Sequence, residues 1–169
     1  MIKPSGLPTV CHRTDRPTTG GGTAILVRRG IVHHPVPVPG LTHLETIAVQ
    51  VTLAGRPVNI LAAYLSPSRP LIGADLTACF GGGLPVLLVG DLNAKHVDWN
   101  SRLTTRRGKL LRDYAENSCL IFGPYSPTTN PYNPSATSDV LDITVTKDVP
   151  FQVCQTSCSA LSSEPPGAH

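Results

Sequence analysis

The sequence predicts an α/β protein in which β-sheets pack together and helices lie outside them. Segments of strand character are interleaved with segments of helical character, and several neighbouring strands have the pattern of antiparallel pairs. The 17 prolines and 15 glycines among 169 residues indicate many turns between short elements. An open α/β sheet is the competing architecture.

Length and composition favour one soluble domain. A chain of 169 residues can bury a substantial core, and a hydrophobic fraction of 40% with 15% charged residues argues against disorder throughout. No apolar run approaches the roughly 20 residues of a membrane span, and the first ten residues, MIKPSGLPTV, lack the apolar region of a signal peptide. We therefore expect an intracellular protein without a membrane partner.

Charge and cysteine content restrict the partners further. The net charge of +3 is compatible with a polyanionic partner but does not require one. The five cysteines form no CxxC pair, so the sequence predicts neither a disulfide framework nor a zinc site. We expect reduced, mostly buried thiols.

The N-terminal half is predicted to be built from strands. After a glycine run, residues 23–30 (TAILVRRG) have the aliphatic and β-branched character of a strand. Residues 33–40 alternate proline with apolar residues and are expected at an edge or in a loop, because proline cannot donate to a ladder. Residues 43–53 alternate cleanly, and a turn at 54–57 connects them to the apolar strand 58–65, which predicts a hairpin.

The C-terminal half mixes helices and strands. Residues 71–80 are predicted to form a short helix closed by three glycines, and the continuous apolar run 84–91 a strand covered on both faces. A second helix is expected over 104–119, capped by Thr104 or Thr105. Strands are then predicted at 119–123 and 138–146, separated by a loop rich in proline and asparagine. The apolar stripe of the second helix consists of Leu110, Leu111, Tyr114, Ala115 and Cys119.

An acid and an amide follow the apolar strand in the stretch LVGDLNAKH, residues 88–96. In α/β sheets, side chains just beyond the carboxyl end of a buried strand face a crevice where sites form. On extended backbone Asp91 and Asn93 would face the same way, so that a carboxylate able to hold Mg²⁺ or accept a proton lies beside an amide able to donate to a phosphoryl oxygen. The alternative is an Asx turn that ends the strand.

Two other strand ends carry polar residues. Tyr64 ends the strand 58–65, although a tyrosine at such a place is commonly a half-buried core residue. Asp139 and Asp142 are three residues apart in a predicted strand and would point to opposite faces, so at most one joins a given site. Asp142 is the better candidate for a partly buried orienting acid, and such an acid needs a partner such as histidine or arginine.

Three segments in this order, AAYLSPSRP, VGDLNAKH and SDVLDITVT, resemble the endonuclease/exonuclease/phosphatase family. The likeness is closest to the apurinic-like endonuclease domain of Jockey-type non-LTR retrotransposons. RTDRPTTGGGTAILVRRGI and HLETIAVQV are also similar to that subgroup, and the most specific stretch is GDLNAKH followed by Trp99 and Asn100. The resemblance places a partial domain of this family at residues 1–162 and leaves 163–169 as an irregular tail.

The resemblance implies a four-layered α/β/β/α sandwich of the DNase I-like fold, incomplete at both termini. It implies hydrolysis of DNA phosphodiesters with Mg²⁺ or Mn²⁺ and no small-molecule cofactor. In such elements the domain nicks target DNA, and the exposed 3′ end primes reverse transcription. The full-length element would therefore add a reverse transcriptase domain, and a functional copy would act in the nucleus.

The resemblance also implies residue roles. Asp91 would hold the metal and orient or deprotonate the attacking water, Asn93 would bind the scissile phosphate, and Tyr64 would hydrogen-bond the same phosphate. Asp142 would hold a catalytic histidine in its working tautomer. His96 could contact DNA or the water shell of the metal, with capping of its loop as the alternative. The basic residues expected to contact the DNA backbone are Arg102, Arg106, Arg107 and Lys109.

The sequence departs from the family at both ends. The strands that carry an asparagine and a metal-binding glutamate would precede residue 1, and Glu45 is expected at an exposed position of a later strand rather than in place of that glutamate. Where the family ends in Ser-Asp-His, this chain has Glu164 and Pro165, and His169 is given no role. We therefore expect a truncated copy with weak Mg²⁺ binding and impaired catalysis.

Three other functions remain open. The chain could be a family member that acts on a phosphomonoester or a phospholipid head group, or a non-catalytic nucleic-acid-binding remnant. It could also have no selected function and aggregate through an exposed sheet edge.

Overall fold

The computed structural model describes residues 9–15, 22–116, 118–129, 137–153 and 155. The expected tail at 163–169 lies outside them. The strands are β1 (Thr9–Asp15), β2 (Gly22–Arg28), β3 (His33–Val36), β4 (Leu44–Leu53), β5 (Arg56–Leu65), β6 (Val86–Asp91), β7 (Leu120–Phe122) and β8 (Asp142–Lys147). The helices are α1 (Gly73–Phe80), the 3₁₀ helix η1 (Val97–Trp99) and α2 (Arg106–Ala115).

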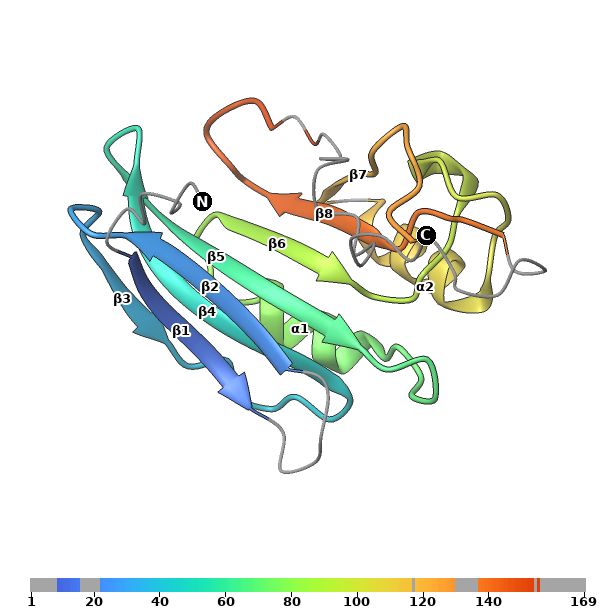
Figure 1. Cartoon of the computed structure of the whole chain (residues 1–169), viewed down its shortest axis with the longest axis horizontal. Coiled ribbons are helices and arrows are strands. Elements are labelled where there is room, and N and C mark those ends of the chain that lie inside the picture. The colour runs from blue at the N-terminus through green and yellow to red at the C-terminus, as the bar shows by residue number, and fades with distance from the viewer. Residues whose placement is uncertain (1–8, 16–21, 117, 130–136, 154, 156–169) are drawn as a thin grey trace, which may run out of the picture.

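Six of the strands form one mixed sheet (Figure 1). Their order is β3-β4-β5-β6-β8-β7, and β1 and β2 form a separate two-stranded hairpin. Within the six-stranded sheet, β5 and β6 are parallel and the other neighbours are antiparallel. A parallel pair needs a crossover connection, which here contains α1.

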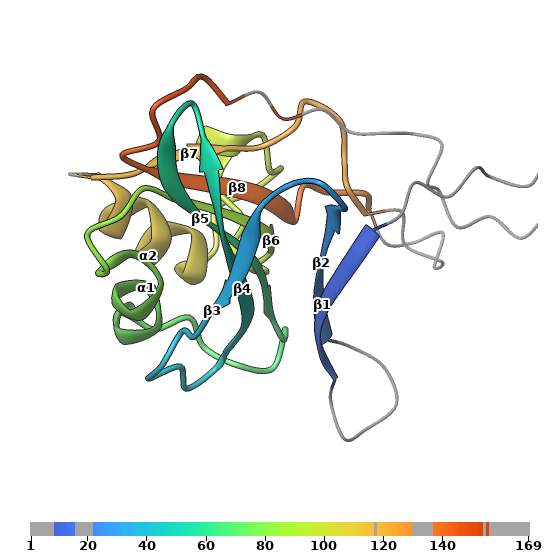
Figure 2. The ribbon, with the colours of Figure 1, turned by 90° about the vertical axis from the view of Figure 1, so that its left-hand side faces the viewer.

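The elements are arranged in layers (Figure 2). Helices α1 and α2 cover one face of the six-stranded sheet, and the β1–β2 hairpin lies on the other face. The main core lies under the helices and includes the fully buried Leu65, Leu76 and Leu111, while a second cluster under the hairpin contains Val27 and Val49. The predicted α/β sandwich is confirmed, and the described residues supply one of its two helix layers and both sheet layers.

The predicted hairpin of β4 and β5 is confirmed. Ala54 and Gly55 connect the two strands with positive φ angles of 49° and 74°, the combination that a two-residue hairpin turn requires. The proline-containing segment is also placed as expected, because Pro35 lies in β3 at the edge of the sheet.

The sequence pattern missed β1. This strand pairs along its whole length with β2, yet its residues that face the large sheet include the polar His12 and Thr14. Two polar residues on the inner face interrupt the apolar alternation by which strands are recognised.

Helix α2 is shorter than predicted. Thr105 caps its start by accepting a hydrogen bond from the Gly108 amide, and the helix ends at Ala115 rather than at Cys119. The amides of Ser118 and Cys119 both donate to the Ala115 carbonyl and close this end.

A buried acid fixes α1 against the start of β4. Asp75, in the first turn of α1, is 0% exposed, and its carboxylate accepts hydrogen bonds from the backbone amides of Thr42, His43 and Leu44 at 2.7–2.9 Å. No sequence pattern predicted this contact.

Strand β6 is less covered than its apolar sequence predicted. Val86 and Leu88 are buried under the helices, but Val89, on the hairpin side, is 40% exposed. The expectation of burial on both faces is wrong for the described residues because the hairpin packs chiefly on β4 and β5. No helix in the described ranges has the length and apolar character needed to cross a membrane.

The described cysteines are free thiols of unequal burial. Cys79 is buried, which raises the pKa of its thiol to about 12, and Cys119 is partly buried. Cys11 is exposed, contrary to the expectation of mostly buried thiols, because it lies on the outer face of the hairpin. Cys154 and Cys158 lie outside the described residues.

The backbone approach between β5 and β6 predicts a strict requirement for glycine at position 90. Gly90 has a φ of 152°, and a Cβ atom there would lie 1.8 Å from the Ala63 carbonyl oxygen. Gly90→Ala should lower the free energy of unfolding by about 3 kcal/mol, through strain and steric overlap. Urea denaturation measures this change in the free energy of unfolding. Gly82→Ala, where nothing lies within 4 Å, is the matched control and should change stability by less than about 0.5 kcal/mol. Equal stability of the two variants would contradict the close approach.

Candidate functional site

Three of the predicted site residues lie in one row across the sheet. Tyr64 on β5 is the register partner of Asp91 on β6, and Asp91 is the register partner of Asp142 on β8. Neighbouring strands are about 4.8 Å apart, so the three residues occupy consecutive positions at one level. Their sequence neighbours Leu65 and Ile143 are buried in the core under the helices, so the row itself faces the hairpin side.

The topology explains why these residues meet. Since β5 and β6 are parallel, their carboxyl ends reach the same edge of the sheet, where Tyr64 and Asp91 stand. The antiparallel β8 begins at that edge with Asp142. The row therefore lies where side chains from three strands can converge on one ligand.

Asn93 joins the row by a turn and not by strand alternation. Its φ of 46° is left-handed, so the expectation that Asp91 and Asn93 lie on one extended segment is wrong. The Asn93 amide donates to Asp91 Oδ1 at 2.8 Å, which forms the Asx turn considered as the alternative. The side-chain Nδ2 of Asn93 donates to the Leu65 carbonyl at 2.9 Å and so lies beside the end of β5, next to Tyr64 in sequence.

The carboxylate of Asp91 is in an unfavourable environment for its charge. Burial raises its pKa above the ordinary value, and the neighbouring Asp142 carboxylate raises it further. The hydrogen bond from Asn93 and the positive charges of Arg107 and Lys95 lower it, but less. Asp91 thus has the raised basicity and the unrelieved negative charge typical of a functional carboxylate.

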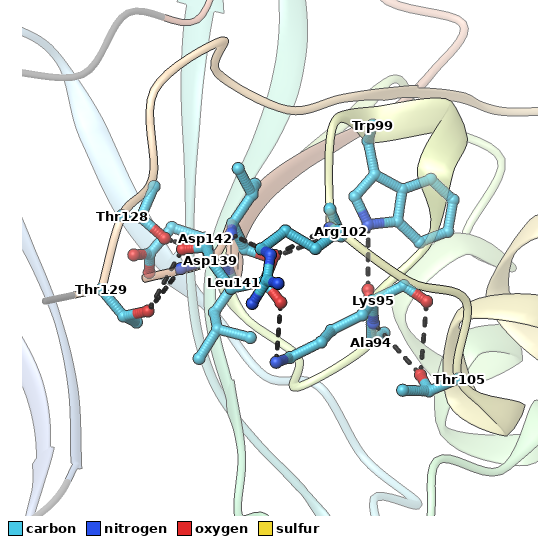
Figure 3. Close-up of polar contacts among 12 residues, drawn as sticks. Ala94, Lys95, Trp99, Arg102, Thr105, Thr128, Thr129, Asp139, Leu141 and Asp142 are labelled. Carbon is cyan, nitrogen blue, oxygen red and sulfur yellow. Dashed lines mark hydrogen bonds and ion pairs between the residues drawn. The ribbon is translucent and has the colours of Figure 1, made fainter. Parts of the chain in front are cut away.

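Asp139 has a structural role beside the row. Asp139 lies before β8 and not in one strand with Asp142 as predicted, so strand alternation does not determine which way it faces. The side chain is 4% exposed and forms an ion pair of 2.8 Å with Lys95 (Figure 3). It also accepts hydrogen bonds from the amides of Arg102 and Val140. Burial acts to raise the pKa of Asp139, but these partners outweigh it and lower the pKa.

The backbone at Asp142 is held from two sides. Thr128 Oγ1 accepts hydrogen bonds from the amides of Leu141 and Asp142 at 2.9 and 3.0 Å (Figure 3). Gln155 donates from Nε2 to the Asp142 carbonyl at 3.1 Å. These contacts fix where β8 begins and hence the level at which Asp142 faces Asp91.

The loop after Asn93 is a rigid connection to α2. The indole of Trp99, 1% exposed, donates to the Ala94 carbonyl at 2.9 Å. Thr105 donates from its amide to the Lys95 carbonyl at 2.9 Å and accepts from the Lys95 amide at its hydroxyl (Figure 3). Lys95 therefore links the loop, α2 and Asp139, and it is the one charged residue of GDLNAKH for which the sequence predicted no role. No local pattern signalled this role, because its partner Asp139 lies 44 residues further along the chain.

The residues predicted to bind substrate surround this loop. His96 accepts a hydrogen bond from the Asp98 amide at Nδ1 and stacks on Trp99 with ring centroids 4.9 Å apart, so it caps η1. Arg102 and Arg106 are exposed, in the loop before α2 and at its first residue. Arg107 is partly buried and donates to the Pro67 carbonyl, which keeps its charge near Asp91.

A metal ion in this row would have carboxylate oxygens as donors. Among the described residues no group of three or more His, Cys, Asp or Glu side chains is placed to hold a metal. Mg²⁺ nevertheless commonly binds through one or two carboxylates and completes its shell with water and substrate phosphate. The adjacent and mutually repelling carboxylates of Asp91 and Asp142 fit that requirement.

Glu45 extends the row on its far side. It lies on β4 opposite Tyr64 and is partly buried, not exposed as expected. Because β5 separates β4 from β6, Glu45 is not the immediate neighbour of Asp91.

Comparisons with known proteins show which family the chain is similar to. Residues 58–164 match the sequence family described as endonuclease–reverse transcriptase. The chain is 32% identical over 127 residues to the RNA-directed DNA polymerase from mobile element jockey of Drosophila funebris, which covers 74% of this chain and 14% of that protein. It is 31% identical over 135 residues to the probable RNA-directed DNA polymerase from transposon BS of Drosophila melanogaster, which covers 77% of this chain and 15% of that protein. The chain thus spans a small part of these relatives.

The fold matches a solved structure. The endonuclease domain of TRAS1, a telomere-specific non-LTR retrotransposon, superposes with a TM-score of 0.68 over 83% of this chain and 67% of that chain. The sequences are 17% identical, so this likeness establishes the fold.

The electrostatics of the row predict that neutralising Asp91 stabilises the protein. Because its pKa is higher in the folded chain than in the unfolded chain, the folded chain binds more protons between those two values, and stability falls as the pH rises through that range. Asp91→Asn removes the free-energy cost of burying the Asp91 charge, but it keeps the Oδ1 atom that accepts the hydrogen bond from the Asn93 backbone amide. We expect the variant to melt at a higher temperature than the native chain at pH 7, and the difference to shrink in acid.

Thermal melts followed by circular dichroism between pH 3 and pH 8 measure this difference. Asp113→Asn, which neutralises an exposed carboxylate on α2, is the matched control and should not raise the melting temperature. A lower melting temperature of Asp91→Asn at pH 7 would show that the Asp91 charge is stabilising after all.

Proposed function

The chain belongs to the endonuclease–reverse transcriptase family, and on that premise we propose that its site hydrolyses phosphodiester bonds of DNA with Mg²⁺, or Mn²⁺, as the metal. The observation that carries the proposal is the row of Tyr64, Asp91 and Asp142 at one level of three adjacent strands, with Asn93 turned back beside it. An acid, an amide and a phenol at one sheet edge are suited to a phosphate group and an attacking water.

Each residue of the row has a role in this proposal. Asp91 orients the water and accepts its proton. Asn93 has a second N–H donor beyond the one given to Leu65, and it donates to a phosphoryl oxygen together with the Tyr64 hydroxyl. Asp142 would orient a catalytic histidine in its working tautomer, a partner that the described residues do not supply.

The metal would be held by Asp91 with help from Asp142. When bound, it would neutralise charge on the phosphoryl group and lower the pKa of a coordinated water. The protein keeps two carboxylates adjacent and partly buried. Their repulsion and the loss of hydration cost free energy, and a bound cation would reduce that cost.

The DNA strand would run along the side of the site formed by the loop after Asn93 and the start of α2. Arg102 and Arg106 are exposed there, and Arg107 lies closer to Asp91. Such residues contact phosphates and set affinity without reading sequence. We propose further that the whole protein carries a reverse transcriptase domain and acts in the nucleus, where its DNA target lies.

A second candidate function is nucleic-acid binding without cleavage. The observation that favours it is the placement of His96, whose ring nitrogen caps η1 and whose face stacks on Trp99. In the described part of the chain, no histidine hydrogen-bonds to Asp142. For this reason the main proposal includes slow hydrolysis by this chain, and the second candidate differs from it in having DNA binding with no hydrolysis.

A plasmid-nicking assay tests the main proposal. The native chain should convert supercoiled plasmid to the open circle in Mg²⁺ or Mn²⁺ and not in chelator. Asp91→Asn should lose about 100-fold or more in rate, because it removes the proton acceptor. Tyr64→Phe should lose roughly 10- to 100-fold, the value of one hydrogen bond to a charged group. Asp113→Asn is the control and should nick at the native rate.

Equal nicking by the native chain and Asp91→Asn would remove Asp91 from the mechanism. No nicking by any of the proteins, together with duplex binding that weakens steeply as salt rises, would establish the second candidate.

A further inference from the structure

A pair of histidines lies between the hairpin and the large sheet, away from the row of Tyr64, Asp91 and Asp142. His12 is in the middle of β1, opposite Ile25 of β2. Ile25 packs in the apolar cluster under the hairpin, and register partners share a face, so His12 also faces the large sheet. The side chain is partly buried, and a polar group in such a place needs a partner.

The partner is His33, the first residue of the edge strand β3. Its register partner Val51 belongs to the same cluster, so His33 faces the hairpin. The Nε2 atoms of the two rings are 2.9 Å apart, and the rings meet edge to face with centroids 4.9 Å apart. The contact joins two elements that share no strand pairing.

The tautomer of His33 is fixed by its other nitrogen. Nδ1 lies 2.7 Å from the Ile31 carbonyl oxygen, which can only accept, so Nδ1 carries the proton. The Nε2 atom of His33 therefore presents a lone pair toward His12. A backbone carbonyl that accepts from the outer ring nitrogen is the usual support of a histidine that binds a metal ion.

We propose that His12 and His33 form a two-imidazole site for a divalent transition-metal ion of the Zn²⁺, Ni²⁺ or Cu²⁺ class. Imidazole nitrogens select this class, whereas the carboxylates of the candidate active site suit harder ions such as Mg²⁺. Two zinc–nitrogen bonds of about 2.0–2.1 Å in tetrahedral geometry put the nitrogens about 3.3 Å apart. Atoms that are 2.9 Å apart reach that separation by a movement of a few tenths of an ångström, together with a rotation of both rings that aims their lone pairs at the ion.

Metal binding replaces the proton shared between the rings. The proton on Nε2 of His12 moves to Nδ1 of the same ring through solvent, so both rings stay neutral and both Nε2 lone pairs face the ion. Water completes the coordination, since no third metal-binding side chain joins the pair among the described residues. Because the ion binds only when the hairpin lies on the sheet, it stabilises that arrangement by mass action.

Zn²⁺ titration calorimetry with the full chain tests the proposal. His12→Gln and His33→Gln should each weaken the binding of one Zn²⁺ by about tenfold or more, because each removes one of two ligands. His34→Gln and Cys11→Ser are the matched controls, since both residues are exposed and adjoin the pair on the opposite faces of their strands. Each control should keep the affinity within about twofold.

Paramagnetic broadening keeps the test valid if a variant fails to fold. Ni²⁺ added to the native chain should broaden the NMR signals of His12 and His33 first and leave those of His43 and His96 sharp. Binding that survives in both His12→Gln and His33→Gln, broadening that begins at other histidines, or no Zn²⁺ binding at all would overturn the proposal and leave a simple hydrogen bond between the two rings.

Discussion

The parallel pairing of β5 with β6 is the constraint on which the candidate site depends. It allows the two strands to end at one edge, and it brings the backbone at Gly90 so close to the Ala63 carbonyl that no side chain fits. This register makes Asp91 the pairing partner of Tyr64, and the antiparallel β8 places Asp142 opposite Asp91. A shift of β6 against β5 by one residue would turn Asp91 to the helix face, away from Tyr64.

Two buried acids stabilise the structure around this row, and they differ from Asp91 in how their charge is balanced. Asp75 accepts three backbone amides, and Asp139 accepts two amides and the ammonium of Lys95. Such partners favour a carboxylate, and they lower the pKa of Asp139. Among the described residues Asp91 accepts only one amide, so burial, with a smaller contribution from the neighbouring Asp142 carboxylate, raises its pKa. The number of donors to each carboxylate therefore distinguishes the two acids that stabilise the fold, which have three each, from Asp91, which has one and remains available for chemistry.

The sequence predicted the local elements better than the contacts between them. The β4–β5 hairpin, the edge position of Pro35 and the cap of α2 follow from turn chemistry and periodicity over a few residues. The meeting of Asp91 with Asp142 depends on pairing across 51 residues of chain, which no local pattern contains, and it was suggested only by the resemblance to a family. The link between Lys95 and Asp139 was missed for the same reason, since it is a tertiary contact between two loops.

The turn at Asp91 shows that a structural and a functional explanation of one stretch can both hold. The Asx turn uses one acceptor position of the carboxylate, which has about four, and one of the two side-chain N–H donors of Asn93. The remaining capacity is available to a metal, a water or a phosphate. Moreover, the turn is what places Asn93 beside the end of β5, which an extended chain would not do. The hydrogen bonds that end the strand are therefore the ones that assemble the site.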